Sequence, residues 1–366
     1  MAKAAKVLDF ESEKFPDIDV INPHTGKVIY TMPCATPKEI AETFKRARVA
    51  SEKLRKMSVK ERLGHLRLLR DAIIRHQDEI VDHVCLETGK PKIDPLMAEV
   101  LGSLSIFDYY FNNAEKALAD KIVKTPIQLM GKKSKVFYDP LGTVLVISPW
   151  NFPFAMMLLP TICALTAGNA VVIKPSEVTP LYGLFEKILE DSGVLENCIQ
   201  VIYGGKETGA LCVDARPDKI IFTGSPRGGS AVMQHAAKYL IPVELELGGK
   251  DPMVIFDDVD VERAADAALT GGLYHSGQIC ISIERLLVQD GIYDKFTNRL
   301  VEKMQKVKTP SKVQGTADQG FSDYAVITPE FQCDKIQEQL DDAVAKGATI
   351  LTGGKRVNGT HEFEPT

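Results

Sequence analysis

The feature that most constrains the fold is an alternation of short β-rich runs with helical patterns between residues 143 and 247. The β-rich runs are TVLVIS, AVVIK, CIQVIY, KIIFTG and PVELEL, and turns and helical patterns separate them. Strands that alternate with helices in this way pair in parallel, because each helix returns the chain to the same end of the sheet. The sequence therefore predicts an α/β fold built on a parallel sheet.

Polar and glycine-rich residues follow these runs along the chain. In order they are PWNF, KPSE, GGKETG, TGSPRGG and ELGGK. Parallel sheets bind ligands outside the carboxyl ends of their strands, where the connecting loops converge. We therefore expect the functional site at this edge of the sheet.

The segments on either side of this region suggest a helical part, a hairpin and a second α/β domain. Residues 38–118 carry apolar residues at helical spacing, and residues 124–142 break that pattern with β-formers around a Gly-Lys-Lys turn, as in a protruding hairpin. After Glu246 a second α/β pattern begins, which contains a strand, RLLV, and an amphipathic helix, YDKFTNRLVEKMQKV. We expect two closely packed domains and one hairpin excursion.

Composition and charge exclude several classes of protein. A chain of 366 residues with 45% hydrophobic and 25% charged residues is an ordinary soluble globular protein. Its net charge of -5 comes from acidic and basic residues mixed along the chain, so no basic face indicates nucleic acid. The opening MAKAAKVLDFESEKF lacks the apolar core of a signal peptide, and no apolar run is long enough to cross a membrane. We expect a cytoplasmic protein with neither a nucleic-acid nor a membrane partner.

The seven cysteines, at positions 34, 85, 163, 198, 212, 280 and 333, are widely separated. They form no CxxC pair and lie near no histidine cluster, so the sequence predicts neither a disulfide framework nor a metal site. Most of these thiols are expected to be reduced core residues.

Five segments together resemble the aldehyde dehydrogenase superfamily, and they occur in the family's order. They are PWNFPF (149–154), KPSE (174–177), FTGS (222–225), LELGGK (245–250) and GQIC with a following arginine (277–285). Shorter likenesses at INPHTGKVI (21–29) and ETGKP (87–91) extend the match over essentially the whole chain. One segment alone is a weak signal, whereas the ordered set is highly specific.

The resemblance implies a fold, an activity and an assembly. It implies two Rossmann-like parallel-sheet lobes, with a dinucleotide-binding domain at 1–123 and 143–247, a bridging or oligomerisation hairpin at 124–142 and a catalytic domain at 248–366. The activity would be NAD(P)-dependent oxidation of a small-molecule aldehyde to the carboxylic acid. The assembly would be a homodimer or homotetramer formed through the hairpin.

Cys280 is the predicted nucleophile. A thiolate adds readily to a carbonyl and leaves a thioester that water can cleave. A cysteine taken at random is far more often a small buried hydrophobe. Gly277 and Gln278 before Cys280, and Arg285 after it, favour the catalytic interpretation, because the other six cysteines lack these neighbours.

By resemblance, two donors stabilise the oxyanion that this attack creates: the side-chain amide of Asn151 and the backbone N–H of Cys280. The alternative for Asn151 is a turn residue that caps the following helix. The resemblance assigns Glu246 as the general base that activates water for thioester hydrolysis. At the end of a buried strand its carboxylate would be desolvated, which suits a base. The alternative for Glu246 is a surface charge, which the surrounding VELELGG disfavours, and Glu244, on the same strand face, is the rival assignment.

The resemblance also implies a set of cofactor contacts. The family binds its dinucleotide through a Gly-x-x-x-x-Gly turn instead of GxGxxG, and residues 224–229 reproduce that spacing, with Ser225 as a pyrophosphate donor. The carboxylate of Glu177 would accept from the ribose hydroxyls and repel a 2′-phosphate, which favours NAD, whereas Arg227 leaves NADP possible. The full set of expected cofactor residues is Ser148, Pro149, Trp150, Lys174, Ser176, Glu177, Gly205, Gly209, Phe222, Thr223, Gly224, Ser225, Gly229, Leu247 and Gly248.

Five apolar residues are expected, by resemblance, to line the substrate tunnel. They are Phe152, Met156, Leu159, Ile279 and Ile281, and no Arg or Lys among them could hold a substrate carboxylate. The sequence therefore favours an aliphatic or aromatic aldehyde over a dicarboxylic semialdehyde. His275, five residues before Cys280, could suggest a Cys-His pair, but a loop or core histidine is the better interpretation, since catalytic partners are usually distant in sequence.

Two alternatives remain open. Family members continue beyond HEFEPT with a Glu-x-Phe-Gly-Pro segment at the nicotinamide ribose, and a chain without it could be a truncated or catalytically defective binding relative. A CoA-acylating relative, which passes the acyl group to a thiol, is disfavoured because such relatives generally lack a carboxylate at the position of Glu246.

Overall fold

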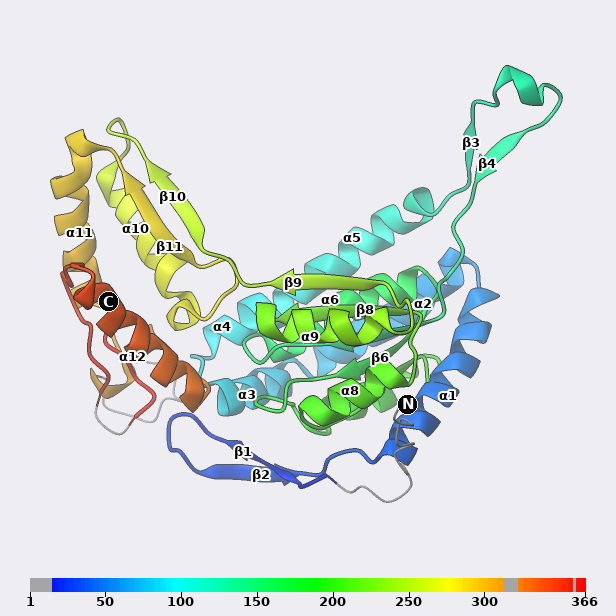
Figure 1. Ribbon diagram of the computed structural model, residues 1–366, viewed down its shortest axis with the longest axis horizontal. Helices are drawn as coiled ribbons and strands as arrows, with labels where there is room; N and C mark the ends of the chain where they lie inside the picture. The colour runs from blue at the N-terminus through cyan, green and yellow to red at the C-terminus, as the bar shows by residue number, and fades with distance from the viewer. Residues whose placement is uncertain (1–14, 313–321, 358–359) are drawn as a thin grey trace, which may run out of the picture.

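A computed structural model describes residues 15–312, 322–357 and 360–366. Its larger body contains a five-stranded parallel sheet in the order β7-β6-β5-β8-β9 (Figure 1). The strands are β5 (Thr143–Ile147), β6 (Ala170–Lys174), β7 (Ile199–Val201), β8 (Lys219–Gly224) and β9 (Val243–Leu247). The predicted α/β fold with a parallel sheet is confirmed. The chain reverses its direction of winding between β5 and β8, and such a switch point is where open α/β sheets bind ligands.

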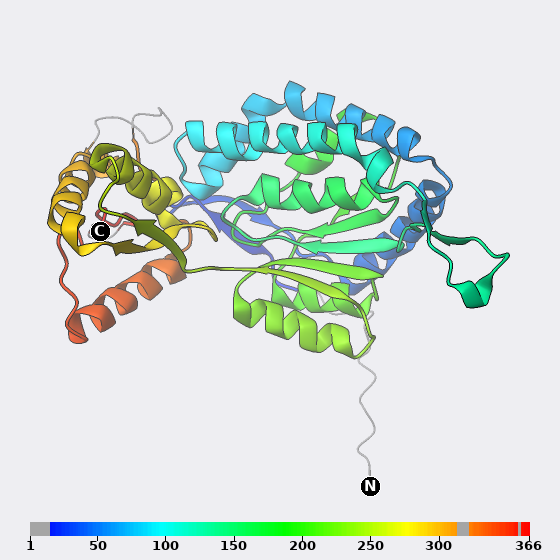
Figure 2. The same cartoon turned by 90° about the horizontal axis from the view of Figure 1, so that it is seen from above.

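Helices cover both faces of this sheet (Figure 2). On one face α6 (Pro153–Thr166) contacts β5 and β6, and α2 (Val59–Arg75) and α5 (Gly102–Ala117) pack over it. On the other face lie α1 (Pro37–Arg55), α8 (Lys206–Asp214) and α9 (Pro226–Ala237). The remaining helices of this body are α3 (Gln77–Thr88), α4 (Ile93–Pro95), a π-helical turn η1 (Leu96–Leu101) and α7 (Leu184–Ser192).

Local sequence explains why the first helices start where they do. Thr36 and Glu39 form a reciprocal capping box at the start of α1, and Ser58 and Glu61 form another at the start of α2. Each box satisfies backbone N–H groups that a helix start leaves without partners. Both helices then bury one apolar face, as the spacing of Leu63, Leu66, Leu69 and Ile73 predicts.

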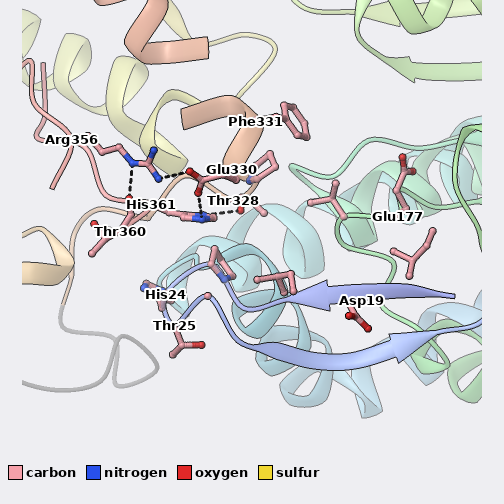
Figure 3. A pocket seen from close by; sticks show the side chains of 16 residues that line it. Asp19, His24, Thr25, Glu177, Thr328, Glu330, Phe331, Arg356, Thr360 and His361 are labelled. Carbon is pink, nitrogen blue, oxygen red and sulfur yellow. Dashed lines mark hydrogen bonds and ion pairs between the residues drawn. The ribbon is translucent and has the colours of Figure 1, made fainter. Parts of the chain in front are cut away.

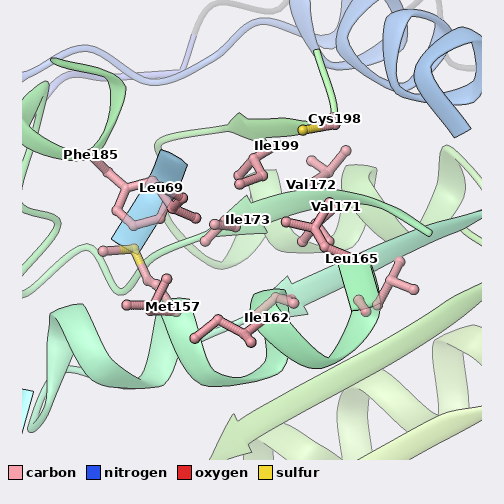
Figure 4. Packing of buried hydrophobic residues seen from close by; sticks show 14 of the residues in the cluster. Leu69, Met157, Ile162, Leu165, Val171, Val172, Ile173, Phe185, Cys198 and Ile199 are labelled. Atoms are coloured by element: carbon pink, nitrogen blue, oxygen red, sulfur yellow. The ribbon is translucent and has the colours of Figure 1, made fainter. Parts of the chain in front are cut away.

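The main hydrophobic core lies between the sheet and α6. Every residue of β5 and β6 is buried, and their side chains pack with those of α2, α6 and α7 (Figure 4). Met157, Ile162, Val171, Ile173 and Phe185 have at most 1% of their surface exposed. This packing holds rigid the strand ends that carry the predicted site residues.

A second, smaller body follows β9. Strands β10 (Asp251–Ile255) and β11 (Ile283–Val288) pair in parallel and are connected through α10 (Val261–Leu273), and α11 (Tyr293–Gln305) packs against α10. Ile255, Ala265 and Phe296 belong to its separate core. Helix α12 (Glu330–Ala345) completes the described part of this body.

Two hairpins extend from the larger body (Figure 1). One pairs β1 (Ile18–Ile21) with β2 (Val28–Met32), and the other pairs β3 (Lys121–Val123) with β4 (Ser134–Val136), with a short 3-10 turn, η2 (Ile127–Leu129), at its tip. The second hairpin projects away from both bodies and exposes Ile122, Ile127 and Met130.

Among the described residues, no helix is long and apolar enough to span a membrane.

Candidate active site

A tight turn presents Cys280 at the surface. The 3-10 turn η3 (Tyr274–Gly277) contains three successive residues with positive φ: His275 at 48°, Ser276 at 55° and Gly277 at 75°. Left-handed backbone at non-glycine residues costs free energy, so surrounding contacts must hold it. The thiol of Cys280, three residues beyond the turn, is exposed, whereas five of the other cysteines are buried and Cys163 is exposed.

The side chain of Gln278 provides those contacts. Its amide nitrogen donates to the backbone carbonyls of His275 and Val326, each at 3.0 Å, and its carbonyl oxygen accepts from the backbone N–H of Thr328 at 2.9 Å. The hydroxyl of Ser276 donates to the carbonyl of Ala325 at 2.7 Å. The Cys280 loop is therefore fixed to the buried segment that precedes α12.

Two more hydrogen bonds join the segments of Asn151 and Glu246, which the sequence predicts to be catalytic, to this loop. The side-chain amide of Asn151 donates to the carbonyl of Gln278 at 2.8 Å, and the backbone N–H of Gly249 donates to the carbonyl of Cys280 at 3.1 Å. A Cβ on Gly249 would lie 2.8 Å from that same carbonyl oxygen, so only glycine allows this approach. The structure thus joins Asn151, Cys280 and the segment just after Glu246.

The two groups predicted to donate to an oxyanion each keep a proton that is free to donate. One proton of the Asn151 amide is used by Gln278, and an amide nitrogen has a second proton to donate. Within the described residues, the backbone N–H of Cys280 has no backbone or side-chain acceptor. Both groups are therefore able to donate to an oxygen bound beside the thiol.

A buried ion pair, Lys90 with Glu99, contacts the residues that follow Asn151. Lys90 and Glu99 are fully buried and 2.8 Å apart, and the second carboxylate oxygen of Glu99 accepts from the backbone N–H groups of Phe154 and Ala155 at 2.7 and 3.1 Å. These N–H groups open α6, where a carboxylate also interacts favourably with the helix dipole. The ammonium of Lys90 lies 3.8 Å from the centre of the Phe152 ring. One charged pair therefore fixes the residues that immediately follow Asn151.

His275 is a core residue. It is fully buried, and its ring meets that of Phe152 edge to face at 5.7 Å between centroids. Burial and the nearby charge of Lys90 hold the pKa of His275 well below its usual value, so the imidazole is neutral. This supports the interpretation of His275 as a core histidine with no catalytic duty.

The expected burial of Glu246 is wrong. Strand β9 is the edge strand of the sheet, and α9 packs against Leu245 and Leu247 on one of its faces. Glu246 lies on the opposite face, and its side chain is exposed to solvent. From the sequence β9 is expected to be a buried strand, but only one neighbour, β8, pairs with it, and its VELEL pattern alternates as in a half-exposed strand. Glu244, the rival, is held in an ion pair with Lys219 at 2.6 Å. Glu246 has no such partner among the described residues.

The residues expected to contact a cofactor all lie at the carboxyl edge of the sheet. Ser148, Pro149 and Trp150 follow β5; Lys174, Ser176 and Glu177 follow from β6; and Gly205 and Gly209 start α8 after β7. Phe222, Thr223, Gly224, Ser225 and Gly229 lead from β8 into α9, and Leu247 and Gly248 end β9. The sheet topology therefore gathers residues from five separate segments.

Several of these residues have features that fit a dinucleotide. Ser225 caps α9 by accepting from the N–H of Gly228 at 3.1 Å, which leaves its hydroxyl proton to donate at a helix N-terminus, a favourable place for phosphate. A Cβ on Gly229 would lie 3.0 Å from Leu247, so glycine lets α9 pack closely on β9. The buried hydroxyl of Ser148 has no partner among the described residues. Lys174 is buried and its ammonium lies 3.3 Å from the carboxylate of Glu177, which is partly exposed.

The five expected substrate residues differ in exposure. Phe152, Met156, Leu159 and Ile279 are half-buried, and Ile281 is 74% exposed. Met156 and Leu159 are three residues apart on α6, so they share a helix face. This partly open apolar face lies just after Asn151.

The sequence interpretation missed three buried charged groups and one glycine: Lys90, Glu99, Glu87 and Gly249. The ETGKP likeness contains Glu87 and Lys90 but assigns them no contact. A signal for Glu99 was available, because PLMAEVLG places one carboxylate in an apolar helical run, and such a charge is buried only with a partner.

The chain was compared with known proteins. A family model described as "Aldehyde dehydrogenase family" matches residues 10–366. The chain is 36% identical to the 4,4'-diapolycopene aldehyde oxidase of Methylomonas sp (90% of this chain, 62% of the relative). It is 37% identical to the mitochondrial succinate-semialdehyde dehydrogenase of Arabidopsis thaliana (95% and 65%). The chain therefore spans less than two thirds of the length of these relatives.

Solved structures give the same result. Lactaldehyde dehydrogenase from Escherichia coli is 31% identical and superposes with a TM-score of 0.89 over 96% of this chain and 72% of that one. Betaine aldehyde dehydrogenase from Staphylococcus aureus, solved in complex with NAD+, is 31% identical with a TM-score of 0.87 over 95% and 70%. Fold, ordered motifs and family model agree, and the chain belongs to the aldehyde dehydrogenase family.

Proposed function

We propose that this chain carries the catalytic centre of an NAD-dependent aldehyde dehydrogenase that oxidises an aldehyde to its carboxylic acid through a thioester on Cys280. One observation carries the proposal: the Asn151 amide, at the switch point of the sheet, is bonded to the loop that presents the exposed Cys280 thiol. A nucleophile and an oxyanion donor thus come from separate lobes to one place. We further propose that the larger body is the cofactor-binding domain and the smaller one the catalytic domain.

In the first step the thiolate of Cys280 attacks the aldehyde carbon and forms a C–S bond. The carbonyl oxygen becomes an oxyanion, which accepts from the Asn151 amide and the Cys280 backbone N–H. Gln278 serves this step by fixing the loop on which both the thiol and that N–H lie. Preorganised donors of this kind stabilise the developing charge without rearranging during the reaction.

The cofactor, when bound, accepts the hydride that leaves the tetrahedral carbon. The residues at the carboxyl edge of the sheet would hold it, with the start of α9 and Ser225 at the pyrophosphate and Lys174 with Glu177 at the adenosine ribose. The carboxylate of Glu177 favours NAD, because it would repel a 2′-phosphate. The neighbouring structure with NAD+ bound supports this assignment.

Water then cleaves the thioester, and Glu246 is the proposed base that removes a proton from that water. Its solvent-exposed carboxylate has no ion-pair partner among the described residues, whereas Glu244 is paired with Lys219, which favours Glu246 over its rival. The same carboxylate favours transfer to water over transfer to coenzyme A.

For the substrate we propose an apolar aldehyde. The half-buried face formed by Phe152, Met156, Leu159 and Ile279 offers contacts for an aliphatic or aromatic chain. The 4,4'-diapolycopene aldehyde oxidase relative supports this class. Since the succinate-semialdehyde dehydrogenase relatives support the other class, the specificity constant should be compared between hexanal or benzaldehyde and succinate semialdehyde.

We also propose self-association through the β3–β4 hairpin, because its exposed Ile122, Ile127 and Met130 form an apolar surface away from both bodies. A cytoplasmic location stays a prediction from the sequence.

The test of the proposed function is production of NADH and acid from an apolar aldehyde, with the Cys280→Ala variant as control and a version extended to the family's length beside it. Turnover that disappears in Cys280→Ala supports the proposal. Turnover by the extended version alone would show that this part holds the centre but needs the remaining segment. Turnover that persists in Cys280→Ala would exclude the mechanism.

A further inference from the structure

A cluster of three potential metal ligands lies outside the proposed active site. Glu330 and Cys333 come from α12 and His361 from the segment near the end of the described chain. One carboxylate oxygen, the sulfur and one ring nitrogen of these residues all lie within 4.8 Å of one another. Figure 3 shows Glu330 and His361 pointing toward each other on one side of a pocket. The sequence pattern gives no sign of this site, because its ligands come from two separate segments.

Helix spacing and hydrogen bonds place these ligands. Glu330 and Cys333 are three residues apart and share one face of α12. Nδ1 of His361 lies 2.8 Å from the carbonyl of Ile327, and Nε2 lies 2.6 Å from the carboxylate of Glu330. A histidine that ligates a metal usually donates its other ring N–H to a carbonyl or carboxylate, which orients the free nitrogen. Nδ1–H of His361 donates to a carbonyl in this way, and Nε2 forms an ion pair with Glu330, so a metal ion here takes the place of the proton between Nε2 and the carboxylate.

The types of donor indicate the cation. Sulfur, imidazole nitrogen and carboxylate oxygen together suit zinc, whereas calcium and magnesium prefer oxygen ligands alone. Zinc binds four ligands at a tetrahedral site, so three protein ligands leave one position for water. The pocket beside the cluster, about 850 Å³ in volume, is lined by Glu330 and His361 and gives that water a path.

The neighbouring charges are compatible with a divalent cation. Arg356 lies 2.7 Å from the other carboxylate oxygen of Glu330, and Asp334 lies 3.8 Å from Arg356. When Cys333 ionises, its thiolate and the carboxylate of Glu330 neutralise Zn²⁺, and Asp334 neutralises Arg356. Arg356 can keep its bond to Glu330 while the oxygen that faces His361 binds the ion.

We propose that Glu330, Cys333 and His361 form a zinc site that ties α12 to the segment around His361. On binding, the S–H bond of Cys333 breaks, and so does the N–H bond that joins Nε2 of His361 to the Glu330 carboxylate. Both protons go to solvent, and the sulfur, Nε2 and the carboxylate oxygen each form a bond to zinc. The site is separate from Cys280 and Asn151, so the proposal does not depend on the proposed dehydrogenase activity. Zinc bound here stabilises the folded chain by mass action, because the unfolded chain does not hold these ligands together.

The test uses Co²⁺ and Zn²⁺ as probes on the purified chain after treatment with a chelator. Tetrahedral Co²⁺ bound to a thiolate gives an intense sulfur-to-cobalt charge-transfer band in the near ultraviolet. We expect this band with one Co²⁺ per chain, and we expect Zn²⁺ to abolish it. We also expect Zn²⁺ to raise the thermal midpoint of unfolding.

The variants identify the ligands. Cys333→Ser and His361→Gln should lose the band, with Zn²⁺ affinity at least about 100-fold weaker, whereas Cys163→Ser and Cys280→Ser, which change the exposed thiols, should keep it. If the buried Cys333→Ser variant does not fold, His361→Gln decides, because it leaves the buried thiol in place. No band in the unmodified chain, or a band that persists in Cys333→Ser or His361→Gln, would overturn the proposal.

Discussion

The side-chain amide of Asn151 donates to the backbone carbonyl of Gln278, 2.8 Å away, and this bond joins the segment after β5 to the loop that carries Cys280. The two residues are far apart in the sequence and belong to the two bodies of the molecule. A donor held at the nucleophile's loop before substrate arrives is preorganised for the oxyanion. The proposed role of Asn151 as an oxyanion donor depends on this contact.

Removal of the Asn151 amide should impair chemistry much more than stability. We expect Asn151→Ala to lower the rate of aldehyde-dependent NADH formation about 100-fold or more, as loss of an oxyanion donor typically does. Iodoacetamide should still alkylate Cys280 at a rate within about threefold of the unmodified chain, because alkylation develops no oxyanion. A matching loss of both rates would mean that Asn151 only supports the loop.

Loss of the buried carboxylate of Glu99 should destabilise the fold. Glu99→Ala leaves Lys90 charged and unpaired in the core and removes the acceptor for the first N–H groups of α6. We expect a loss of about 3–5 kcal/mol in the free energy of unfolding, measured by urea denaturation. The double variant Lys90→Met/Glu99→Gln should recover part of that loss, since no unpaired charge remains. A double variant less stable than Glu99→Ala would contradict this explanation.

The α/β fold could be predicted from the sequence, and so could the edge of the sheet at which the proposed cofactor residues lie. Short β-rich runs followed by turns mark β5, β6, β8 and β9 closely. The central strands β5 and β6 are almost continuously apolar, and polar residues follow them. The placement of the cofactor residues at one edge then follows from the topology. Strand β10 starts with Asp-Pro, and its sequence shows no clear strand pattern. Its pairing with β11 depends on contacts between residues distant in sequence.

What could not be predicted was the environment of individual charges. The exposure of Glu246 depends on which face of β9 a helix covers: α9 packs on the two leucines of that strand, and the face of Glu246 is left exposed, which the pattern VELEL alone does not state. The Lys90 and Glu99 pair and the contact of Gly249 with the Cys280 carbonyl likewise arise from three-dimensional packing. The spacing of side chains in a sequence predicts helices and strands, but it does not identify which residue a buried charge pairs with.

Glu87 should make stability depend on pH. Burial raises the pKa of Glu87 from 4.5 to about 7, although bonds from Tyr30 and the Leu181 N–H act in the opposite direction. The folded state therefore binds a proton that the unfolded state releases between pH 4.5 and 7, so this contribution to stability is complete below pH 4.5 and is lost as the pH rises through 7.

The measurement is urea unfolding of the unmodified chain and of Glu87→Gln between pH 5 and pH 8. We expect the stability of the unmodified chain relative to the variant to fall by about 2.5 kcal/mol across this window, since each pKa unit corresponds to about 1.4 kcal/mol and part of the shift lies below pH 5. A difference that stays constant with pH would show that Glu87 ionises alike in both states.

The carboxylate of Glu177 should set the cofactor preference. Its charge would repel a 2′-phosphate, but it is only partly buried, so solvent screens the effect. We expect Glu177→Gln to improve binding of NADP relative to NAD about tenfold, measured by calorimetric titration of both cofactors. Arg227→Ala is the matched control and should shift the ratio in the opposite direction. An unchanged ratio in Glu177→Gln would remove the basis for the NAD preference.

The most direct test of the central claim is the covalent intermediate itself. The chain is mixed with benzaldehyde and NAD, quenched in acid within the first turnover, and digested for mass spectrometry. The account predicts a benzoyl group on the peptide that contains Cys280, formed together with an equal amount of NADH, and accumulating further in Glu246→Gln because hydrolysis is slowed. An acyl group on another cysteine, or NADH and acid formed while Cys280 stays unmodified in Glu246→Gln, would contradict it.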